Sequence, residues 1–565
     1  MPRTTRTAPL HAALGLALLA GLAGCQNPLA RSDSDLGRRA PAERLRRIEP
    51  LPIDRYARPA SGTPEADAEA SRRRLEALPT RSVTLAETRA SALANNLDIQ
   101  VALVDPSIAR ANLSAEEARF EAAFTTRALW QELDSPTSSS LASAQSKTQT
   151  VEPGVRIPLR TGGTATVSLP VARSETDNQF STLNPAWTSD LAFSISHPLL
   201  RDAGRTAATT AIRIASYSEQ IAQAQTKLRI INQLSNADRA YWRLYQARKD
   251  LEVRQQQYEL ATAQLARAQR RVAAGALGEI EVVRAQSGVA DRLEAIIVAQ
   301  NTLLRRQREF KRVANMPEMP VESSTAVVPE TEPAPVEYLV DASALMSDAV
   351  QSRMEMLEIE LRLLADAASI ELDRNQLLPR LDLDATYRIN GLGASSQDSF
   401  RTLGKNKFED WSIGATLEVP LGNEAAKSRL RADLLARIQR LATRESREQT
   451  VRQEVLDAID AIEAGWQRIL ASRQSTVLAA RALAAEQRQF DVGGSTSTNV
   501  LDAATRLAEA QLSEIRALAD YQIAQTDLAE ATGTLLGAAH VQWAPRELDN
   551  TTAGGRPNDP EASAK

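Results

Sequence analysis

The sequence predicts a mainly α-helical protein with some membrane β-structure, built as a duplicated repeat of long coiled-coil helices and short strands. Three observations lead to this fold class. The 70 residues from Arg205 to Ala274 contain neither Gly nor Pro, which is typical of an uninterrupted helix. Several segments of about ten residues alternate apolar and polar side chains. The two halves of the chain also resemble each other in the order of these elements.

The composition excludes several classes of function. The 565 residues include 67 Lys+Arg and 71 Asp+Glu, a net charge of −4, whereas nucleic-acid platforms usually carry a basic excess. Three His and one Cys are too few for a His-rich zinc site or an internal disulfide. We therefore expect no cofactor, no metal and no nucleic-acid partner.

The N-terminus predicts export. Arg3 and Arg6 precede an apolar run that stops at Cys25 and is too short for a stable membrane helix, so residues 1–24 are expected to be a signal peptide. The four residues Leu22-Ala23-Gly24-Cys25 resemble the bacterial lipobox, which implies cleavage before Cys25 and lipidation of its thiol. Gln26, where Asp would imply inner-membrane retention, points to the outer membrane. The alternative is an ordinary secretory signal with an incidental Cys.

Composition also divides the rest of the chain. Residues 25–80 are rich in Arg, Ala and Pro without a sustained period, and are interpreted as an N-terminal tether anchored by its lipid. Two repeats are expected at 82–316 and 338–540. Residues 317–337 between them contain five prolines and predict an extended linker, and residues 541–565 predict a disordered tail.

The helical segments are unusually long. At about 1.5 Å per residue, the run from Arg205 to Ala274 could reach roughly 100 Å. Apolar residues, most of them large, recur in it every seven positions from Ile230 to Val272, with Ala247, Ala261 and Ala268 three positions after members of that row, as in a closely packed coiled coil. Further helical runs are predicted at 279–316, 423–464, 466–492 and 495–532. Alone, this pattern would equally suit a coiled-coil rod.

The predicted strands argue against a simple rod. Residues 187–196, 381–389 and 411–419 each place apolar side chains on one face and polar or charged ones, such as Asp382 and Asp384, on the other. A lipid-facing strand with a wet inner face requires this pattern, although a soluble sandwich strand has the same period. A few strands beside very long helices in an exported chain favour membrane strands. Residues 155–159 and 165–171 predict an additional hairpin around Gly162-Gly163.

Three pairs of segments reveal the repeat. Residues 91–105 match 347–361 in their helical pattern. The strands 190–200 and 412–422 both end at a Pro-Leu pair, and the Gly-containing segments 270–286 and 488–504 align Gly275 with Gly493. Each half is thus predicted to run helix, strand, loop, strand, long helix, Gly turn, long helix, so one duplicated unit explains the length better than independent domains.

The order of four features along the chain resembles the TolC-type outer-membrane efflux family. These features are the lipobox, the entry helix with ALANNLDIQ, the strand-ending Pro-Leu pairs and the VGGSTSTNVLDA turn. The resemblance covers about residues 82–540. It implies a trimer in which each chain gives four strands to one twelve-stranded β-barrel, continued by a periplasmic α-helical tube. It also implies a periplasmic adaptor and an inner-membrane pump as partners. The additional hairpin departs from this pattern, and the sequence leaves open whether it joins the barrel.

The resemblance also implies where function resides. The two hairpin tips would dock the adaptor; their residues are Gly275, Leu277 and Gly278 in the first, and Val492, Gly493, Gly494, Ser495 and Thr496 in the second. Asn499 and Asp502 align with the two aspartates that line the narrowest aperture, with Asn499 replacing the first of them. The alternatives are ordinary turn chemistry for the glycines and a plain solvated helix position for Asp502.

The predicted function is that of an outer-membrane channel of a tripartite efflux system, a passive exit duct for small molecules, anchored by lipid and extending into the periplasm. A type I protein-secretion duct and a periplasmic coiled-coil scaffold without a pore are the alternatives. No catalytic motif accompanies these features: the sequence lacks G-x-x-x-x-G-K-[ST], H-E-x-x-H and G-x-S-x-G. We expect no enzyme activity.

Overall fold

The computed structural model describes residues 52–57, 73, 77–137, 143–275 and 278–541. The chain divides into two compact units, one formed by Met1–Asp67 with Glu547–Lys565 and the other by Ala68–Arg546. In the first unit the described part is a short 3-10 helix, η2 (Ile53–Tyr56). The second unit contains the strands and the long helices.

The elements of this unit follow the predicted order twice. The first repeat comprises β1 (Thr80–Val83), α4 (Leu85–Asn95), α5 (Leu97–Ala102), α6 (Asp105–Glu117), η3 (Ala118–Phe120), β2 (Ala123–Asp134), β3 (Gln145–Pro158), β4 (Thr164–Ser168), β5 (Val171–Thr176), β6 (Ala186–Pro198), α7 (Arg205–Ala208), α8 (Thr210–Ala273) and α9 (Ile280–Ala314). The second comprises β7 (Ala326–Pro329), α10 (Ala342–Ser352), α11 (Met354–Gln376), β8 (Arg380–Gly393), α12 (Ser396–Gly404), β9 (Glu409–Glu418), α13 (Glu424–Asp491), α14 (Ser497–Ala531) and α15 (Leu535–Ala538). The two repeats differ in their strands, which are more numerous in the first.

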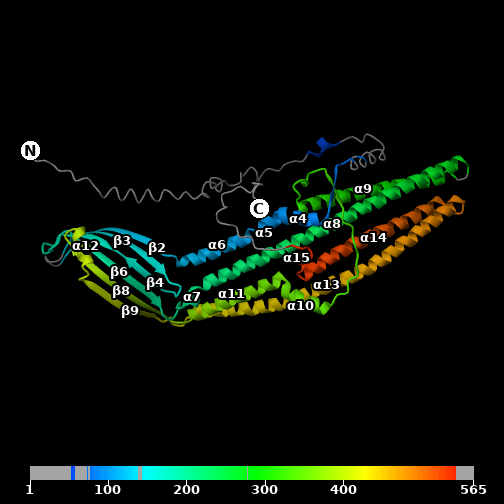
Figure 1. The fold of residues 1–565 in the computed structure, drawn as a ribbon. Helices are drawn as coiled ribbons and strands as arrows, with labels where there is room; N and C mark the ends of the chain where they lie inside the picture. The colour runs from blue at the N-terminus through cyan, green and yellow to red at the C-terminus, as the bar shows by residue number, and fades with distance from the viewer. Residues whose placement is uncertain (1–51, 58–72, 74–76, 138–142, 276–277, 542–565) are drawn as a thin grey trace, which may run out of the picture. The chain divides into compact units, whose positions relative to one another are not determined.

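Two long antiparallel hairpins dominate the unit. Helix α8 has 64 residues and pairs with α9, while α13 has 68 residues and pairs with α14. The two hairpins also contact each other, through α8 and α14. Figure 1 shows the strands β2, β3, β4, β6, β8 and β9 at one end of the unit and the two hairpin turns at the other.

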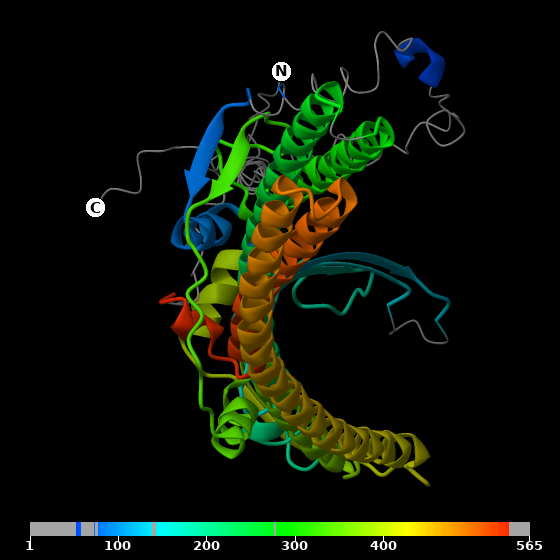
Figure 2. The ribbon, with the colours of Figure 1, turned by 90° about the vertical axis from the view of Figure 1, so that its right-hand side faces the viewer.

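Helix α13 runs unbroken through Gly465, so the prediction of two separate helical runs, 423–464 and 466–492, was wrong. Figure 2 shows it as one continuous curved helix. The reason lies in the partner helix. A Cβ at position 465 would come 3.0 Å from a ring carbon of Tyr521, so the glycine allows α14 to approach closely instead of ending α13.

The predicted seam of α8 is buried along part of its length. Ile230, Ala237 and Leu244, seven residues apart, are all buried as the heptad pattern requires. Nearer the turn the small residues of the seam, Ala261 and Ala268, are the buried ones. Helix packing there is therefore close, since small side chains bring helix axes together.

The entry helices of both repeats break at equivalent positions. Helix α4 gives way to α5 at Asn96, whose side chain accepts hydrogen bonds from the N–H groups of Asp98 and Ile99, a typical N-cap. Helix α10 gives way to α11 at Arg353, which pairs with Glu355 and with Glu454 of α13. The corresponding breaks support the internal repeat.

Glu355 shows how this second break is stabilised. Burial alone would raise the pKa of its carboxyl, but the hydrogen bond and charge of Arg353, together with the charge of Arg447, outweigh burial and hold the pKa below its usual value. A carboxyl with a depressed pKa favours the folded state above its unfolded pKa and loses that contribution as pH falls. The break is thus held by charge at neutral pH.

The segment predicted as an extended linker contains a strand. Within residues 317–337, β7 pairs in parallel with β1, and this ribbon lies against α8. Val327, Tyr241 and Phe310 belong to one buried cluster, and the Tyr241 hydroxyl accepts a hydrogen bond from the Thr331 N–H at 2.8 Å. Burial raises the pKa of Tyr241. The prolines therefore end a helix and lead into an ordered crossing between the repeats.

One antiparallel sheet contains all the remaining strands, in the order β2-β3-β4-β6-β8-β9, with β5 pairing to β3 and β6. The predicted strands at 187–196, 381–389 and 411–419 correspond to β6, β8 and β9. The additional hairpin predicted at 155–159 and 165–171 is present, and it joins this sheet between β2 and β6. Strand β2 was not predicted.

Candidate functional site

The sheet has one apolar and one polar face. In β8, Leu383, Ala385 and Tyr387 alternate with Asp382, Asp384 and Thr386, and successive residues of a strand point to opposite faces. The exposed fractions on the apolar side are high: 74% for Trp411, 68% for Ile413 and 43% for Phe193. An apolar face this exposed is typical of a surface that meets lipid or another protein.

At one level of the sheet, the same division extends across all of its strands except β5. A row of residues in register runs through six strands and is apolar throughout: Phe124, Val155, Val167, Phe193, Tyr387 and Trp411. In the adjacent row on the opposite face, β2 contributes Ala123, and the other strands contribute polar side chains: Arg156, Thr166, Ser194, Thr386 and Ser412. The sequence alone showed this division for three of the strands, and the register now extends it to the others.

The first hairpin tip joins α8 to α9. Gly275 follows α8 with a φ of +71°, a left-handed conformation that costs glycine little, and Gly278 precedes α9. Leu277, the third predicted residue of this tip, lies outside the described residues. The structure thus places Gly275 in the predicted turn, while its role in docking stays a prediction.

The second tip joins α13 to α14 and is more exposed. Gly493 has a φ of +84°, and the neighbouring Val492 is 85% exposed. The Gly494 N–H donates to the Gln489 carbonyl at 2.8 Å, and the Ser495 hydroxyl donates to a Glu486 carboxylate oxygen at 2.8 Å. Thr496 is the N-cap of α14. All five predicted residues of this tip therefore form one hydrogen-bonded turn with an apolar side chain at its apex.

Asn499 and Asp502 lie one turn apart at the start of α14, and both are exposed. The Asn499 amide donates to the Ser495 hydroxyl at 3.2 Å, which ties it to the tip. Both line a groove of about 890 Å³ between α13 and α14, together with Arg506 and Glu509. The two predicted aperture residues thus share one polar surface, to which Asp502 contributes a carboxylate.

Contacts between the two tips were not predicted from the sequence. The guanidinium of Arg271, on α8, donates to the Phe490 carbonyl at 2.8 Å and lies 4.9 Å from the centre of the Phe490 ring, a cation–π arrangement. The Gln264 amide donates to Ser497 at 3.2 Å. These residues are distant in sequence and belong to no local motif, so no sequence signal could have identified them. They fasten the first hairpin to the second beside Asn499 and Asp502.

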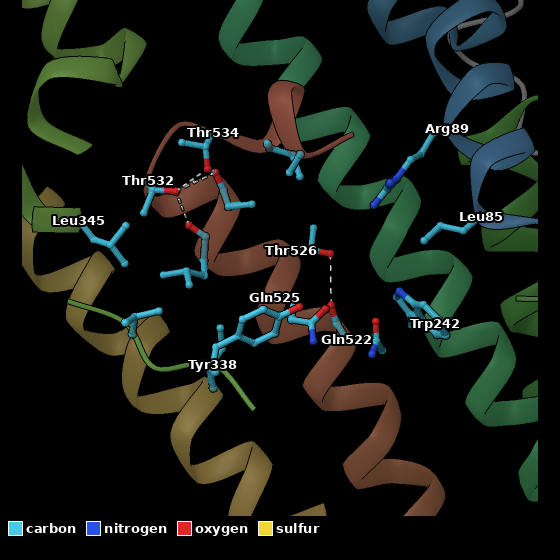
Figure 3. Close-up of a pocket in the computed structure, with 16 residues that line it drawn as sticks. Leu85, Arg89, Trp242, Tyr338, Leu345, Gln522, Gln525, Thr526, Thr532 and Thr534 are labelled. Atoms are coloured by element: carbon cyan, nitrogen blue, oxygen red, sulfur yellow. Dashed lines mark hydrogen bonds between the residues drawn. The ribbon is translucent and has the colours of Figure 1, made fainter. Parts of the chain in front are cut away.

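A buried ion pair lies between the entry helix and the long helices. Arg89, on α4, forms a two-pronged pair with Asp238 of α8 at 2.9 and 2.7 Å, and the Asp238 side chain is fully buried. Figure 3 shows Arg89 at the edge of a pocket of about 440 Å³ lined by α4, α8, α14 and the segment around Tyr338. Thr526 of α14 approaches the same carboxylate at 3.5 Å. Three helices of both repeats therefore meet at Asp238.

The described ranges contain no cluster of His, Cys, Asp or Glu suited to hold a metal ion. Nor does any helix there combine the length and the apolar character needed to cross a membrane. Cys25, the predicted lipidation site, lies outside the described residues.

Comparisons with known proteins agree with this architecture. Residues 345–534 match the model of the outer membrane efflux protein family. Outer membrane protein TolC of Vibrio cholerae is 26% identical over 304 residues, which is 53% of this chain and 66% of that protein. The chain thus spans slightly less than two thirds of this relative.

Solved channel structures share the fold over both repeats. The outer-membrane channel OprN has a TM-score of 0.61 at 16% identity, covering 80% of this chain and 90% of its own. VceC of Vibrio cholerae gives 0.58 at 14% identity, covering 80% and 96%. The open state of the MtrE channel of Neisseria gonorrhoeae gives 0.56 at 16% identity, covering 80% and 89%.

The fold is therefore that of the outer-membrane channels, with long helices continuing from a sheet. The chain is similar to the outer membrane efflux protein family in its second repeat, and to TolC of Vibrio cholerae.

Proposed function

We propose that this protein is the outer-membrane channel of a tripartite efflux system, a passive exit duct for small molecules that an inner-membrane pump drives through a periplasmic adaptor. The observation that carries the proposal is the sheet with one apolar face, whose strands β6 and β9 lead into the long helices α8 and α13. A scaffold without a pore has no need of such a sheet. The match of residues 345–534 to the outer membrane efflux protein family supports efflux as the setting.

Oligomerisation follows from the edges of the sheet. Every residue of β9, and all but the first of β2, is exposed along the two outer edges. In hydrocarbon, an unsatisfied backbone N–H or C=O costs several kcal/mol, so membrane sheets close into barrels. One chain does not close its sheet. We propose a homotrimer, as in the family, with its apolar face in contact with outer-membrane lipids.

The proposed duct is tested by conductance in planar lipid bilayers. The purified full chain should insert and conduct ions in discrete steps, because the polar face of the sheet would line a wet lumen. The wild-type protein after heat denaturation is the control for contaminating pores. Repeated failure to conduct, from preparations whose far-UV spectrum shows intact secondary structure, would exclude the channel.

The two hairpin tips are the proposed docking surface for the adaptor, and Asn499 and Asp502 the proposed aperture. Support comes from the exposed Val492 at the apex of the second tip and from the polar groove directly behind it. Because Asn499 is uncharged, a trimer would present one carboxylate per chain at this level, from Asp502. Mutual repulsion and attraction for cations are then weaker than in a ring with two carboxylates per chain.

Replacing Asp502 with alanine is expected to reduce cation selectivity and raise single-channel conductance, because the aperture loses both the negative charge and the bulk of the Asp502 side chain. Asp502→Asn keeps the size and removes the charge, so it should change selectivity alone. Glu509→Ala is the matched control, since Glu509 lines the same groove about 10 Å further along the helix. Reversal potentials in a salt gradient give the selectivity. Equal effects of Asp502→Ala and Glu509→Ala would remove Asp502 from the aperture.

Lipid anchoring at Cys25 is also proposed, on the lipobox-like sequence and on the position of the chain's one Cys. Mass spectrometry of the mature N-terminus tests it directly. A diacylglycerol mass on Cys25 is the expected result, and an unmodified thiol would leave the protein attached by its sheet alone.

A further inference from the structure

The additional hairpin turns out to consist of full-length sheet strands. Strand β3 has 14 residues and pairs with β2 along 12 of them. A membrane strand needs about 9–11 residues. The turn between β3 and β4 is tied to β6, because the side chains of Thr161 and His197 are within hydrogen-bond distance at 3.0 Å. The hairpin is therefore part of the sheet rather than a loop lying on it.

Strands β4 and β5 are two parts of one strand. Gly154 of β3 pairs with Ser168 at the end of β4, and Val151 of β3 pairs with Val171 at the start of β5. Between these two pairs each strand advances by three residues, so the pairing register does not slip. The same continuity holds against β6. The Leu169 N–H donates to the Pro153 carbonyl at 2.8 Å, and the Asp190 N–H donates to the Pro170 carbonyl at 2.9 Å.

Proline explains the apparent gap. Pro153 and Pro170 have no N–H and cannot complete the ladder at this point, although the hydrogen bonds that remain possible are made. With β4 and β5 counted as one strand, the sheet has six strands: β2, β3, β4–β5, β6, β8 and β9. The first repeat supplies four of them and the second supplies two.

The hairpin also carries the lipid-facing pattern. Val155 and Val167 lie in the same apolar row as Phe193, which is on a strand present in both repeats. Arg156 and Thr166 lie in the same polar row as Ser194. A hairpin that decorated a loop in water would have no reason to continue both faces in register.

We propose, on the basis of the trimer proposed above, that three chains close an eighteen-stranded barrel, to which the hairpin 145–176 contributes two of each chain's six strands. The direction of the strands allows it: β2 and β9 run antiparallel through the alternating sheet, so β9 of one chain can pair with β2 of the next. Because barrel diameter grows roughly linearly with strand number, the exit mouth is about one and a half times as wide as that of a twelve-stranded barrel.

This width affects which cargo can leave. In the described part of each chain, the hairpins are still formed by the four long helices α8, α9, α13 and α14, so the helical part gains nothing from the additional strands. The size limit for exported molecules then lies at the helical tips, and the membrane mouth passes whatever the tips admit, bulky molecules included.

Matched single-cysteine variants test the barrel. A fluorophore is attached to Val155→Cys, Val167→Cys or Phe193→Cys, and to the neighbours Arg156→Cys, Thr166→Cys or Ser194→Cys. The protein is then placed in vesicles containing a brominated lipid. The first three should lose most of their fluorescence to the lipid quencher, and the other three should respond instead to aqueous iodide, because lipid-facing and lumen-facing residues alternate. Wild type, treated identically, gives the background from Cys25.

The outcomes separate this proposal from the proposed function. Lipid quenching at positions 155, 167 and 193 supports six strands per chain. Quenching at 193 but not at 155 and 167 overturns the eighteen-stranded barrel and leaves the channel intact. Absence of lipid quenching at all three positions, 193 included, overturns the barrel and the membrane channel together.

Discussion

Replacing Arg89 with alanine is expected to lower the free energy of unfolding by about 3–5 kcal/mol, the usual cost of removing one partner of a buried ion pair. The reason is the position of Asp238, whose side chain is fully buried. Both of its carboxylate oxygens accept from Arg89, and its other polar neighbour, Thr526, is 3.5 Å away. Without Arg89, the charge of Asp238 stays buried and unpaired. Denaturant unfolding of the purified protein measures the loss.

Arg229→Ala is the matched control for this prediction. Arg229 also joins α8 to an entry helix, through Asp105 of α6 at 2.6 Å, but both partners are about half exposed. Exposed pairs contribute roughly 0–1 kcal/mol, so the control should unfold almost as wild type does. Similar losses for both variants would show that Asp238 is not the critical charge.

A double replacement separates the ion pair from its packing. Arg89→Met with Asp238→Leu removes both charges and keeps apolar volume, and such replacements of buried pairs are often neutral or stabilising. We expect it to recover most of the stability lost in Arg89→Ala. If it did so while conductance changed, the pair would hold the helices in register for function rather than for stability.

The strands show how far the sequence could be interpreted. Strands β8 and β9 could be predicted from the sequence because polar or charged side chains, such as Asp382 and Asp384 in β8, alternate with apolar ones. Strand β2 could not, since Thr126 interrupts its apolar face and Glu132 ends it, and a membrane strand gives a weak signal on its own. The sequence left open whether the additional hairpin joins the other strands, and its pairing with β2 and β6 shows that it is part of the sheet.

The helices show a second limit. Their lengths and turns follow from Gly and Pro alone, and the predicted tips at Gly275 and Gly493 are where the helices reverse. At Gly465 the same rule failed, because Tyr521, far along the chain, packs against that position. The links from Arg271 to Phe490 and from Arg89 to Asp238 are likewise non-local. Local residue preferences cannot specify which distant side chain will fill a space.

The lipid-facing row gives the second large effect. Phe193→Arg is expected to destabilise the membrane-inserted protein by about 2–4 kcal/mol per chain, the cost of an Arg on the lipid face near the bilayer midplane. Phe193 is 43% exposed on the apolar face, between Val167 of β4 and Tyr387 of β8. Neither of these directly paired residues has an acidic side chain that would neutralise the new charge. In a trimer the cost recurs in every chain, so assembly should suffer more than a single chain does.

Ser194→Arg is the adjacent control on the same strand. Ser194 points to the opposite face, in the row with Thr166 and Thr386, where a charged side chain would meet water in the lumen. Its stability should stay near that of wild type, and its ion selectivity should shift toward anions instead. Urea unfolding from lipid vesicles measures stability, and the fraction of trimer is measured on gels run without heating. Were Ser194→Arg to prevent assembly while Phe193→Arg did not, the two faces would be reversed, with the charged rows toward lipid and the aromatic row lining the pore. Equal loss for both would place neither face in lipid, and the sheet would then have to be covered by protein on both sides.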